Sequence, residues 1–322
     1  MKYLNLTKGY EPFNHIQRGY GIIEYETFTF NGGEPHIKIK LNNNINTIEK
    51  NDGRILITIR INSFNDLGLL FIAVDSIRKI SPDSKLSLFM PYFPGARQDR
   101  VMVDGEPLTS GVYVKLLDSL KFESITSFDV HSDVVAGMFG VLNTKFINMD
   151  NHKFTLDCFK DIYPKYNDIL NIPYLISPDA GANKKVHELG KFLSMINPIE
   201  IVKCDKTRNV KTGLITNFMV HYDDLGGKDC VIVDDICDGG GTFLGLAKEL
   251  KKKNSGDLYL IVSHGIFSNG VENLLEHFKC IYTTDSIGNV IQITTEMSRI
   301  VGQSCKYHKL ASRSKLKVIK II

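Results

Sequence analysis

Short apolar runs rich in β-branched and aromatic residues alternate along the chain with longer mixed segments. Runs of the first kind predict buried strands, and longer segments with one apolar face predict helices. In the first half we expect strands at Arg54–Asn62, Lys85–Pro91 and Ser124–Val130, with helices at Asp66–Lys79 and Thr109–Lys121. Strands that alternate with helices of this length are typical of βαβ units and a parallel sheet.

The same alternation restarts in the second half, beyond a join near Thr144–Asp150. We expect strands there at Tyr174–Ser177, Cys230–Val233, Asp257–Val262 and Cys280–Thr283, with helices at Ala182–Lys191 and Thr242–Lys251. The first 50 or so residues indicate a β-rich entry with a turn at Gly32-Gly33. The pattern therefore predicts an α/β protein with two domains, residues 1–147 and 148–322.

Composition agrees with a folded α/β protein and disfavours one class of function. The 322 residues are 43% hydrophobic and 23% charged, which is ordinary for globular chains. Lys and Arg number 39 against 36 Asp and Glu, and this formal net charge of +3 is a weak basic excess for a nucleic-acid binder. The basic tail Lys306–Ile322 is more typical of a solvated face than of a nucleic-acid patch. We expect no nucleic-acid partner.

Targeting signals and cysteine spacing favour a cytoplasmic protein. No apolar run approaches the roughly 18 residues of a membrane helix, and the first residues lack the apolar region of a signal peptide. The six cysteines form no C-x-x-C pair and have no zinc-like spacing with histidine. We therefore expect reduced thiols, no membrane contact and a cytoplasmic location.

The strongest local signal is the segment Val231-Ile-Val-Asp-Asp-Ile-Cys-Asp-Gly-Gly-Gly-Thr242. An apolar strand leads to the paired carboxylates Asp234 and Asp235, which suit ribose hydroxyls or hydrated Mg²⁺. A glycine loop then opens a helix, and it consists of Asp238, Gly239, Gly240, Gly241 and Thr242. Glycines let backbone N–H groups approach an anion, and a helix N-terminus adds positive potential. The loop therefore predicts a phosphate site.

The order of residues in this segment separates it from better-known phosphate loops. It lacks the lysine of a Walker A loop and the spacing of a G-x-G-x-x-G fingerprint. A simple glycine turn with exposed acids is the alternative interpretation. The joint occurrence of strand, paired acids, glycines and hydroxyl in one order favours phosphate binding.

Five further segments accompany this loop in the sequence. They are Phe30-Asn-Gly-Gly-Glu34, Pro91-Tyr-Phe-Pro-Gly-Ala-Arg-Gln-Asp-Arg100, Phe128-Asp-Val-His131, Ile176-Ser-Pro-Asp-Ala-Gly181 and Ser263-His-Gly-Ile-Phe267. Together they resemble, in order, motifs of the ribose-phosphate pyrophosphokinase (PRPP synthetase) family, and the loop looks like the ribose 5-phosphate loop of phosphoribosyltransferase-type folds. The resemblance implies two phosphoribosyltransferase-type domains, each with a mainly parallel sheet flanked by helices.

The resemblance also implies an activity. The family transfers the β,γ-diphosphoryl group of ATP to the anomeric 1-hydroxyl of ribose 5-phosphate, which gives PRPP and AMP, with Mg²⁺ as cofactor. By position, Lys206 and Arg208 would be the catalytic pair on a mobile loop, where two cations can stabilise the transferred group. Asp234, Asp235 and the glycine loop would bind the ribose phosphate. Otherwise Lys203–Lys211 would be a solvated basic loop.

An ATP site in the first domain follows from the same resemblance. Phe30 and Arg97 would flank adenine, because an aromatic face and a guanidinium plane suit a purine. The other implied ATP-binding residues are Glu34, Gln98, Arg100 and His131, and the implied metal positions are His131 and Asp179. A core aromatic at a strand end is the alternative for Phe30.

Four departures from the family pattern bear on substrate and regulation. Gly239 stands where the family's Asp-Thr-x-Gly-Thr loop has threonine, which removes a hydroxyl that would bond the terminal phosphate. The other departures are Gly32 in place of Asp or Asn, Asp104 and Glu106 where basic residues are typical, and Gly53-Arg54 as the remnant of an Arg-Gly segment. The last of these puts ordinary allosteric control in doubt.

Several functions stay open at this point. A looser glycine loop would tolerate a bulkier 5′ substituent, so ADP-ribose is an alternative acceptor that would give ADP-ribose 1-pyrophosphate. A silent regulatory subunit is disfavoured by the retention of Lys206 and Arg208. A phosphoribosyltransferase, which would consume PRPP, is disfavoured by the two α/β halves. The resemblance also implies a homo-oligomer, either a dimer or a hexamer.

Overall fold

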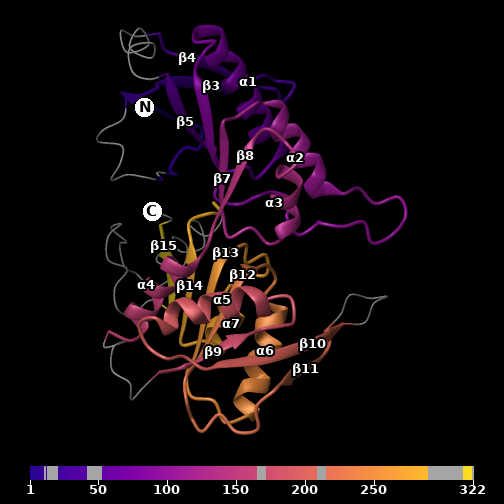
Figure 1. Ribbon diagram of the computed structural model, residues 1–322, viewed down its shortest axis with the longest axis vertical. Coiled ribbons are helices and arrows are strands. Elements are labelled where there is room, and N and C mark those ends of the chain that lie inside the picture. The colour runs from indigo at the N-terminus through magenta and orange to yellow at the C-terminus, as the bar shows by residue number, and fades with distance from the viewer. Residues whose placement is uncertain are drawn as a thin grey trace. The chain divides into compact units, whose positions relative to one another are not determined.

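The computed structural model describes most of the chain. The described residues are 1–10, 12, 21–41, 53–164, 172–208, 215–288 and 315–320, without the side chains of Arg208, Ile215 and Thr216. The chain divides into two compact units. Unit 1 is Met1–Asp150 and also takes Lys320, and unit 2 is Asn151–Ile319 (Figure 1).

Unit 1 is built on a parallel sheet with the strand order β2-β1-β5-β6-β7-β8. The strands are β1 (Lys2–Asn5), β2 (Gly21–Ile22), β5 (Arg54–Thr58), β6 (Lys85–Phe89), β7 (Ser124–Phe128) and β8 (Lys145–Met149). The connecting helices are α1 (Phe64–Ile80), α2 (Thr109–Ser119) and α3 (Asp133–Phe139). Consecutive strands from β5 to β8 are neighbours, as βαβ connections require.

Local sequence explains the longest helix of this unit. The hydroxyl of Ser63 accepts a hydrogen bond from the Asp66 N–H at 3.3 Å, and the Asp66 carboxylate accepts one from the Ser63 N–H at 2.8 Å. This reciprocal capping box satisfies backbone donors at the start of α1. A separate hairpin of β3 (Tyr25–Thr29) and β4 (Pro35–Ile39) places Ile37 and Ile39 in the same core as α1.

Unit 2 has a second sheet, in the order β11-β10-β9-β12-β13-β14-β15. Its strands are β9 (Tyr174–Ser177), β10 (Ile201–Arg208), β11 (Ile215–Val220), β12 (Cys230–Cys237), β13 (Leu258–Gly265), β14 (Cys280–Thr284) and β15 (Leu316–Ile319). Its helices are α4 (His152–Ile162), α5 (Asn183–Ser194), α6 (Gly241–Lys252) and α7 (Glu272–His277). Only the β10–β11 pair is antiparallel among these described strands.

The predicted fold class is confirmed, since both units carry mainly parallel sheets flanked by helices (Figure 1). Two elements differ from expectation. The strand predicted at Cys230–Val233 continues to Cys237, because Asp234 pairs with Val262 and Cys237 with Gly265 of β13. The paired carboxylates therefore belong to the strand instead of following it.

Strands β8 and β10 were not predicted from the sequence pattern, and β5 is shorter than predicted. β8 occupies the stretch that was expected to join the halves, and the basic segment from Lys203 to Arg208 is strand β10 rather than loop. The strand expected to reach Asn62 ends at Thr58. The Ile59 N–H still donates to the Phe89 carbonyl of β6 at 3.1 Å, but the Arg60 N–H donates to a side chain, the Thr7 hydroxyl, at 2.9 Å.

Each unit has its own hydrophobic core. The described cysteines contribute buried side chains and form no disulfide among themselves. Five cysteines in the described residues are free and buried: Cys158, Cys204, Cys230, Cys237 and Cys280. Burial raises the pKa of the Cys204, Cys230 and Cys237 thiols to about 12. Within the described ranges, no helix combines the length and apolarity needed to cross a bilayer.

Candidate active site

Asp179 and Lys206 form an ion pair in unit 2. Asp179 lies in the turn between β9 and α5, where its carboxylate accepts a hydrogen bond from the Ala182 N–H at 3.0 Å. Lys206 comes from β10, the strand beside β9. Both side chains are largely shielded, with 20% of Lys206 and 17% of Asp179 exposed. The pair therefore fixes a cation at the carboxyl end of the β9 strand.

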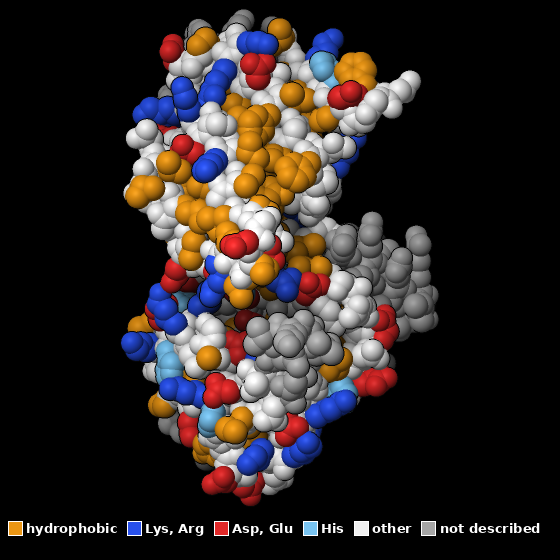
Figure 2. Space-filling model, turned by 90° about the vertical axis from the view of Figure 1, so that its right-hand side faces the viewer, with side chains coloured by type: hydrophobic (Ala, Val, Ile, Leu, Met, Phe, Trp, Pro, Cys, Tyr) orange, Lys and Arg blue, Asp and Glu red, His pale blue; other side chains and the backbone are white. Residues whose placement is uncertain are grey.

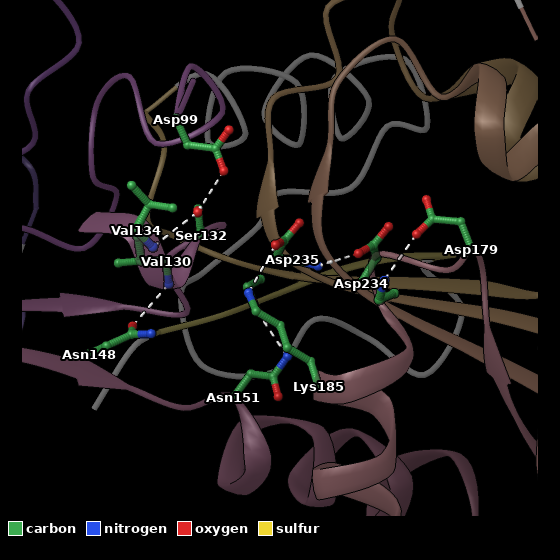
Figure 3. Close-up of polar contacts among 12 residues, drawn as sticks. Asp99, Val130, Ser132, Val134, Asn148, Asn151, Asp179, Lys185, Asp234 and Asp235 are labelled. Atoms are coloured by element: carbon green, nitrogen blue, oxygen red, sulfur yellow. Dashed lines mark hydrogen bonds and ion pairs between the residues drawn. The ribbon is translucent and has the colours of Figure 1, made fainter. Parts of the chain in front are cut away.

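The paired acids of β12 occupy the same edge of the sheet. Asp235 is buried and forms an ion pair with Lys185 of α5 at 3.0 Å (Figure 3). The Asp235 N–H donates to the Asp234 carboxylate at 2.9 Å. Burial raises the pKa of Asp234 well above its ordinary value, and the negative charges of Asp235 and Asp179 raise it further. This cluster has an excess of negative charge that a cation or hydroxyl donors would offset.

The glycine loop follows β12 and opens α6. Gly240 is the N-cap of this helix and has a φ of +78°, a left-handed conformation that glycine adopts without strain. The turn after β13 supports the loop from the side: the Ser268 hydroxyl donates to the Asp238 carboxylate at 2.7 Å, and the Asn269 amide donates to the Gly239 carbonyl at 3.3 Å. Backbone N–H groups at the start of α6 are thereby available to an anion.

The strand that carries Lys206 is attached to the helix that carries the loop. Lys206 pairs with Phe218 across the β10–β11 hairpin. The Phe218 ring lies so close to Gly245 of α6 that a Cβ at residue 245 would overlap it. The contact holds the hairpin against the helix whose N-terminus forms the predicted phosphate site.

In unit 1, the end of the Ala-Arg-Gln-Asp-Arg segment is bound to the turn after β7. The Asp99 carboxylate accepts a hydrogen bond from the Ser132 hydroxyl at 2.7 Å (Figure 3). It also accepts one from Arg100 Nε at 2.9 Å. The Arg100 hydrogen bond is the main reason that the pKa of Asp99 lies below its ordinary value. Ser132 directly follows His131, whose side chain is exposed. The segment that ends at Arg100 and the segment that ends at His131 are therefore joined through the Asp99–Ser132 hydrogen bond.

Arg97 and Gln98 are exposed at the start of the same segment. They follow a turn at Gly95, which has a φ of +73° and accepts a hydrogen bond from the Gln98 N–H at 2.9 Å. Polar side chains on such an ordered turn are accessible to a ligand.

Phe30 is not a core residue, since 53% of its surface is exposed. Its ring packs edge-on against Phe28 and His36, with centroid distances of 4.8 Å and 5.7 Å, on the β3–β4 hairpin. Next to it, the Glu34 carboxylate fills the place of a side chain at Gly32, where a Cβ would stand 2.6 Å from Glu34 Oε2. The hairpin thus presents an aromatic surface beside a carboxylate.

The predicted residues fall into two groups. The residues in unit 2 are Asp179, Lys206, Asp234, Asp235 and the loop Asp238–Thr242, while those in unit 1 are Phe30, Glu34, Arg97, Gln98, Arg100 and His131. The Arg208 side chain lies outside the described residues. Among the residues that are described, no three His, Cys, Asp or Glu side chains form a group that could hold a metal by itself.

Three residues near the unit 2 cluster were given no role by the sequence. Lys185 pairs with Asp235, and Ser268 and Asn269 support the glycine loop. One signal could have pointed to the last two. They form a polar turn directly after a buried strand, and the carboxyl ends of adjacent parallel strands share one edge of the sheet.

The fold and the site define the class of protein. Two α/β units with mainly parallel sheets, one with a glycine loop after paired strand carboxylates, are of the phosphoribosyltransferase type. The crystal structure of phosphoribosylpyrophosphate synthetase from Mycobacterium smegmatis matches the fold with a TM-score of 0.72, over 99% of this chain and 94% of that chain, at 18% identity.

Sequence comparison then defines the family. A family model described as "Phosphoribosyl synthetase-associated domain" matches residues 210–305. The ribose-phosphate pyrophosphokinase of Ureaplasma parvum serovar 3 is 34% identical over 210 residues, which are 65% of this chain and 58% of that protein. A Streptococcus pneumoniae serotype 4 protein named "Putative ribose-phosphate pyrophosphokinase 2" is 31% identical over 252 residues, 74% of this chain and 73% of that protein. The chain belongs to the ribose-phosphate pyrophosphokinase family.

Proposed function

We propose that this protein transfers the β,γ-diphosphoryl group of ATP to the anomeric 1-hydroxyl of ribose 5-phosphate, giving PRPP and AMP. The observation that carries the proposal is the unit 2 cluster. A shielded Lys206 pairs with Asp179, and the negative charge of Asp179 also raises the pKa of Asp234. Asp234 lies in β12, the strand that leads directly into the glycine loop. Phosphoryl transfer depends mainly on positioning and on charge stabilisation, which this cluster can supply.

Each part of the cluster has a role in this proposal. The loop Asp238–Thr242 binds the 5-phosphate at the N-terminus of α6, and Asp234 and Asp235 accept hydrogen bonds from the ribose hydroxyls. Lys206, with Arg208, stabilises the negative charge of the transferred diphosphoryl group. Membership of the ribose-phosphate pyrophosphokinase family supports these roles at the level of the reaction type.

ATP is assigned to the exposed groups of unit 1. The aromatic surface at Phe30 and the guanidinium of Arg97 suit a purine ring, and Glu34 and Gln98 can form polar contacts with it. Arg100 is the last residue of the segment Pro91–Arg100, and His131 is the last residue of Phe128–His131. Both side chains can bind phosphate oxygens. Exposure of these side chains in the described structure agrees with a role in binding rather than in packing.

The charge of the carboxylate cluster fits Mg²⁺ as the cofactor. The negative charges of Asp235 and Asp179 raise the pKa of Asp234, yet no three-ligand metal group is present among the described residues. Mg²⁺ is commonly held by one or two carboxylates together with substrate phosphates and water. We therefore propose that Asp179 of unit 2 contacts Mg²⁺, which would neutralise phosphate charge. For unit 1, the family resemblance suggests His131 as a contact to Mg²⁺ that enters with ATP.

The direct test is an acceptor assay. Purified protein is incubated with ATP, Mg²⁺ and either ribose 5-phosphate or ADP-ribose, and AMP release and product mass are measured. Ribose 5-phosphate should give PRPP, and ADP-ribose should give little ADP-ribose 1-pyrophosphate. If no AMP is released with either ribose 5-phosphate or ADP-ribose, the diphosphokinase assignment is refuted and a silent regulatory subunit is favoured. Consumption of PRPP with a free base would instead identify a phosphoribosyltransferase.

We also expect a cytoplasmic homo-oligomer. Free buried cysteines agree with a reducing compartment. Hydrophobic side chains gather on one face of unit 1 (Figure 2), and the exposed apolar residues of this unit include Phe64, Val101, Met102, Val103 and Val112. Exposed apolar surface of this kind favours association. Sedimentation equilibrium should give a dimer or a hexamer, and a monomer at micromolar concentration would contradict the expectation.

A further inference from the structure

The space beside Gly239 is occupied, although this residue has no side chain. A Cβ built at residue 239 would stand 2.8 Å from Nδ2 of Asn269, which is closer than real Cβ contacts come. The Ser268 hydroxyl would lie 3.7 Å from the same point. A threonine at residue 239 would therefore require the amide of Asn269 to move from its place beside the loop. The absence of a side chain does not make the glycine loop more open, because a neighbour fills the gap.

The amide of Asn269 is held in place by its own turn. Nδ2 donates to the carbonyl of Gly239 at 3.3 Å, so the amide is bonded to the loop itself. The adjacent Ser268 hydroxyl donates to Asp238 at 2.7 Å, at the first residue of the loop. Gly270, with a φ of +74°, donates its N–H to the Phe267 carbonyl at 2.9 Å and closes the turn. The contacts attach the turn after β13 to the loop after β12.

An asparagine amide has more hydrogen-bonding capacity than this contact uses. Its nitrogen has two donors, of which the Gly239 carbonyl takes one. Asn269 is an exposed residue, so a ligand in the loop can reach its amide. A donor bonded to a phosphate oxygen forms a charge-assisted hydrogen bond, which is stronger than one between neutral groups. The Asn269 amide can thus replace the hydroxyl that is missing at residue 239, since it is a hydrogen-bond donor beside the same residue.

We infer that Asn269 is a substrate-binding residue that donates to the terminal phosphate of the sugar acceptor, in place of a side-chain hydroxyl at residue 239. The inference rests on the proposed function, and it narrows the acceptor class. Because the gap beside Gly239 is filled, the loop accepts a compact phosphate monoester such as ribose 5-phosphate. A 5′-diphosphate ester such as ADP-ribose would have to displace the amide.

Three variants test the exchange: N269G, G239T and the double variant G239T/N269G. N269G should raise KM for ribose 5-phosphate about 10- to 100-fold, the expected loss for one hydrogen bond to a charged group, with KM for ATP unchanged. G239T should also raise KM for ribose 5-phosphate, because its side chain would push the Asn269 amide out of its place beside the loop. The double variant should recover most of the affinity, since the threonine then has both the space and the hydroxyl. Additive losses in the double variant would overturn the inference.

The chain offers a matched control for N269G. Asn254 is another exposed turn asparagine, and its amide donates to Asp224 at 2.9 Å beyond the far end of α6. N254G should leave KM for ribose 5-phosphate within twofold of the parent protein. Thermal melting of every variant shows that it is folded before affinities are compared.

Calorimetry with ribose 5-phosphate separates this inference from the proposed function. If the parent protein binds ribose 5-phosphate but releases no AMP, the proposed function fails while the effect of N269G on Kd still decides the role of Asn269. Binding by N269G that stays within twofold of the parent would remove Asn269 from the site. Use of ADP-ribose in preference to ribose 5-phosphate by the parent protein would overturn the narrowed acceptor class and leave the diphosphokinase chemistry standing.

Discussion

Lys206 and Phe218 lie opposite each other in the antiparallel β10–β11 hairpin, and the Phe218 ring packs against Gly245 of α6. Side chains that face each other across an antiparallel pair project from the same face of the hairpin. The position of Lys206, the proposed catalytic lysine, is therefore coupled to a packing contact with the helix that begins at the glycine loop. We expect the Phe218–Gly245 contact to affect turnover, although neither residue is proposed to touch the substrate.

Substitution of Gly245 by alanine should displace the hairpin. The new Cβ would overlap the Phe218 ring, and overpacking of this kind costs about 1–3 kcal/mol of stability. Because a shift of about 1 Å in a catalytic group can cost up to about 10²-fold in rate, kcat should fall by at least about 10-fold. Steady-state AMP release and thermal melting are the measurements.

Two further variants interpret that result. Gly245→Ala combined with Phe218→Leu should restore much of kcat, since the smaller side chain makes room for the methyl group. Gly137→Ala in α3 is the matched control, because no atom lies within 4 Å of a Cβ there. Unchanged kcat in Gly245→Ala would show that the hairpin is not positioned by this contact.

Lys206→Ala should separate binding from turnover. The change removes the cation paired with Asp179 and the proposed stabilisation of the transferred group, so kcat should fall about 10²- to 10³-fold. Affinity for ATP, measured by calorimetry, should change little. Lys203→Ala is the control, since Lys203 is an exposed residue of the same strand. Equal activity of Lys206→Ala and the parent protein would exclude Lys206 from catalysis.

Asp234→Asn should exchange activity for stability. Because the pKa of Asp234 is raised in the folded state, its carboxylate destabilises the fold at pH values above the ordinary carboxyl pKa. The neutral amide should therefore raise the melting temperature at pH 7, and the gain should disappear in acid, where the carboxyl is protonated in both states. Turnover should drop because a ribose-binding acceptor is lost.

Asp83→Asn serves as the comparison, since Asp83 is exposed in the turn before β6. It should change neither the melting temperature nor turnover noticeably. A lower melting temperature for Asp234→Asn at pH 7 would mean that the carboxylate is favourably paired in the folded protein, contrary to the cause assigned to its pKa.

The cysteines give a prediction that does not involve activity. Burial raises the pKa of all five described thiols, so thiolate, the reactive form, is scarce at pH 8. In the native protein at most one of the six cysteines, Cys305, should react rapidly with a thiol reagent, and all six should react in denaturant. Rapid labelling of two or more thiols in the native state would contradict the buried assignment.

Local sequence patterns were enough to predict the fold class and to propose the chemical groups of the site. The alternation of apolar strands and helices is a local property, and β9 was predicted with its observed bounds, Tyr174–Ser177. Paired acids before a glycine loop likewise occur within one segment, so their order predicts a phosphate loop and the start of α6. The boundaries that failed, such as the end of β12, depend on hydrogen bonds to a strand distant in sequence.

Contacts between groups far apart in the sequence became known from the folded arrangement of the strands and helices. Lys185 neutralises Asp235 from a helix fifty residues earlier in the chain, and Lys206 reaches Asp179 because β10 lies beside β9. Gly239 alone suggested an open loop suited to a larger acceptor, whereas Asn269 fills that space from the turn after β13. Local patterns determine which side chains are available, but only the pairing of distant strands determines the space and the charge around each of them.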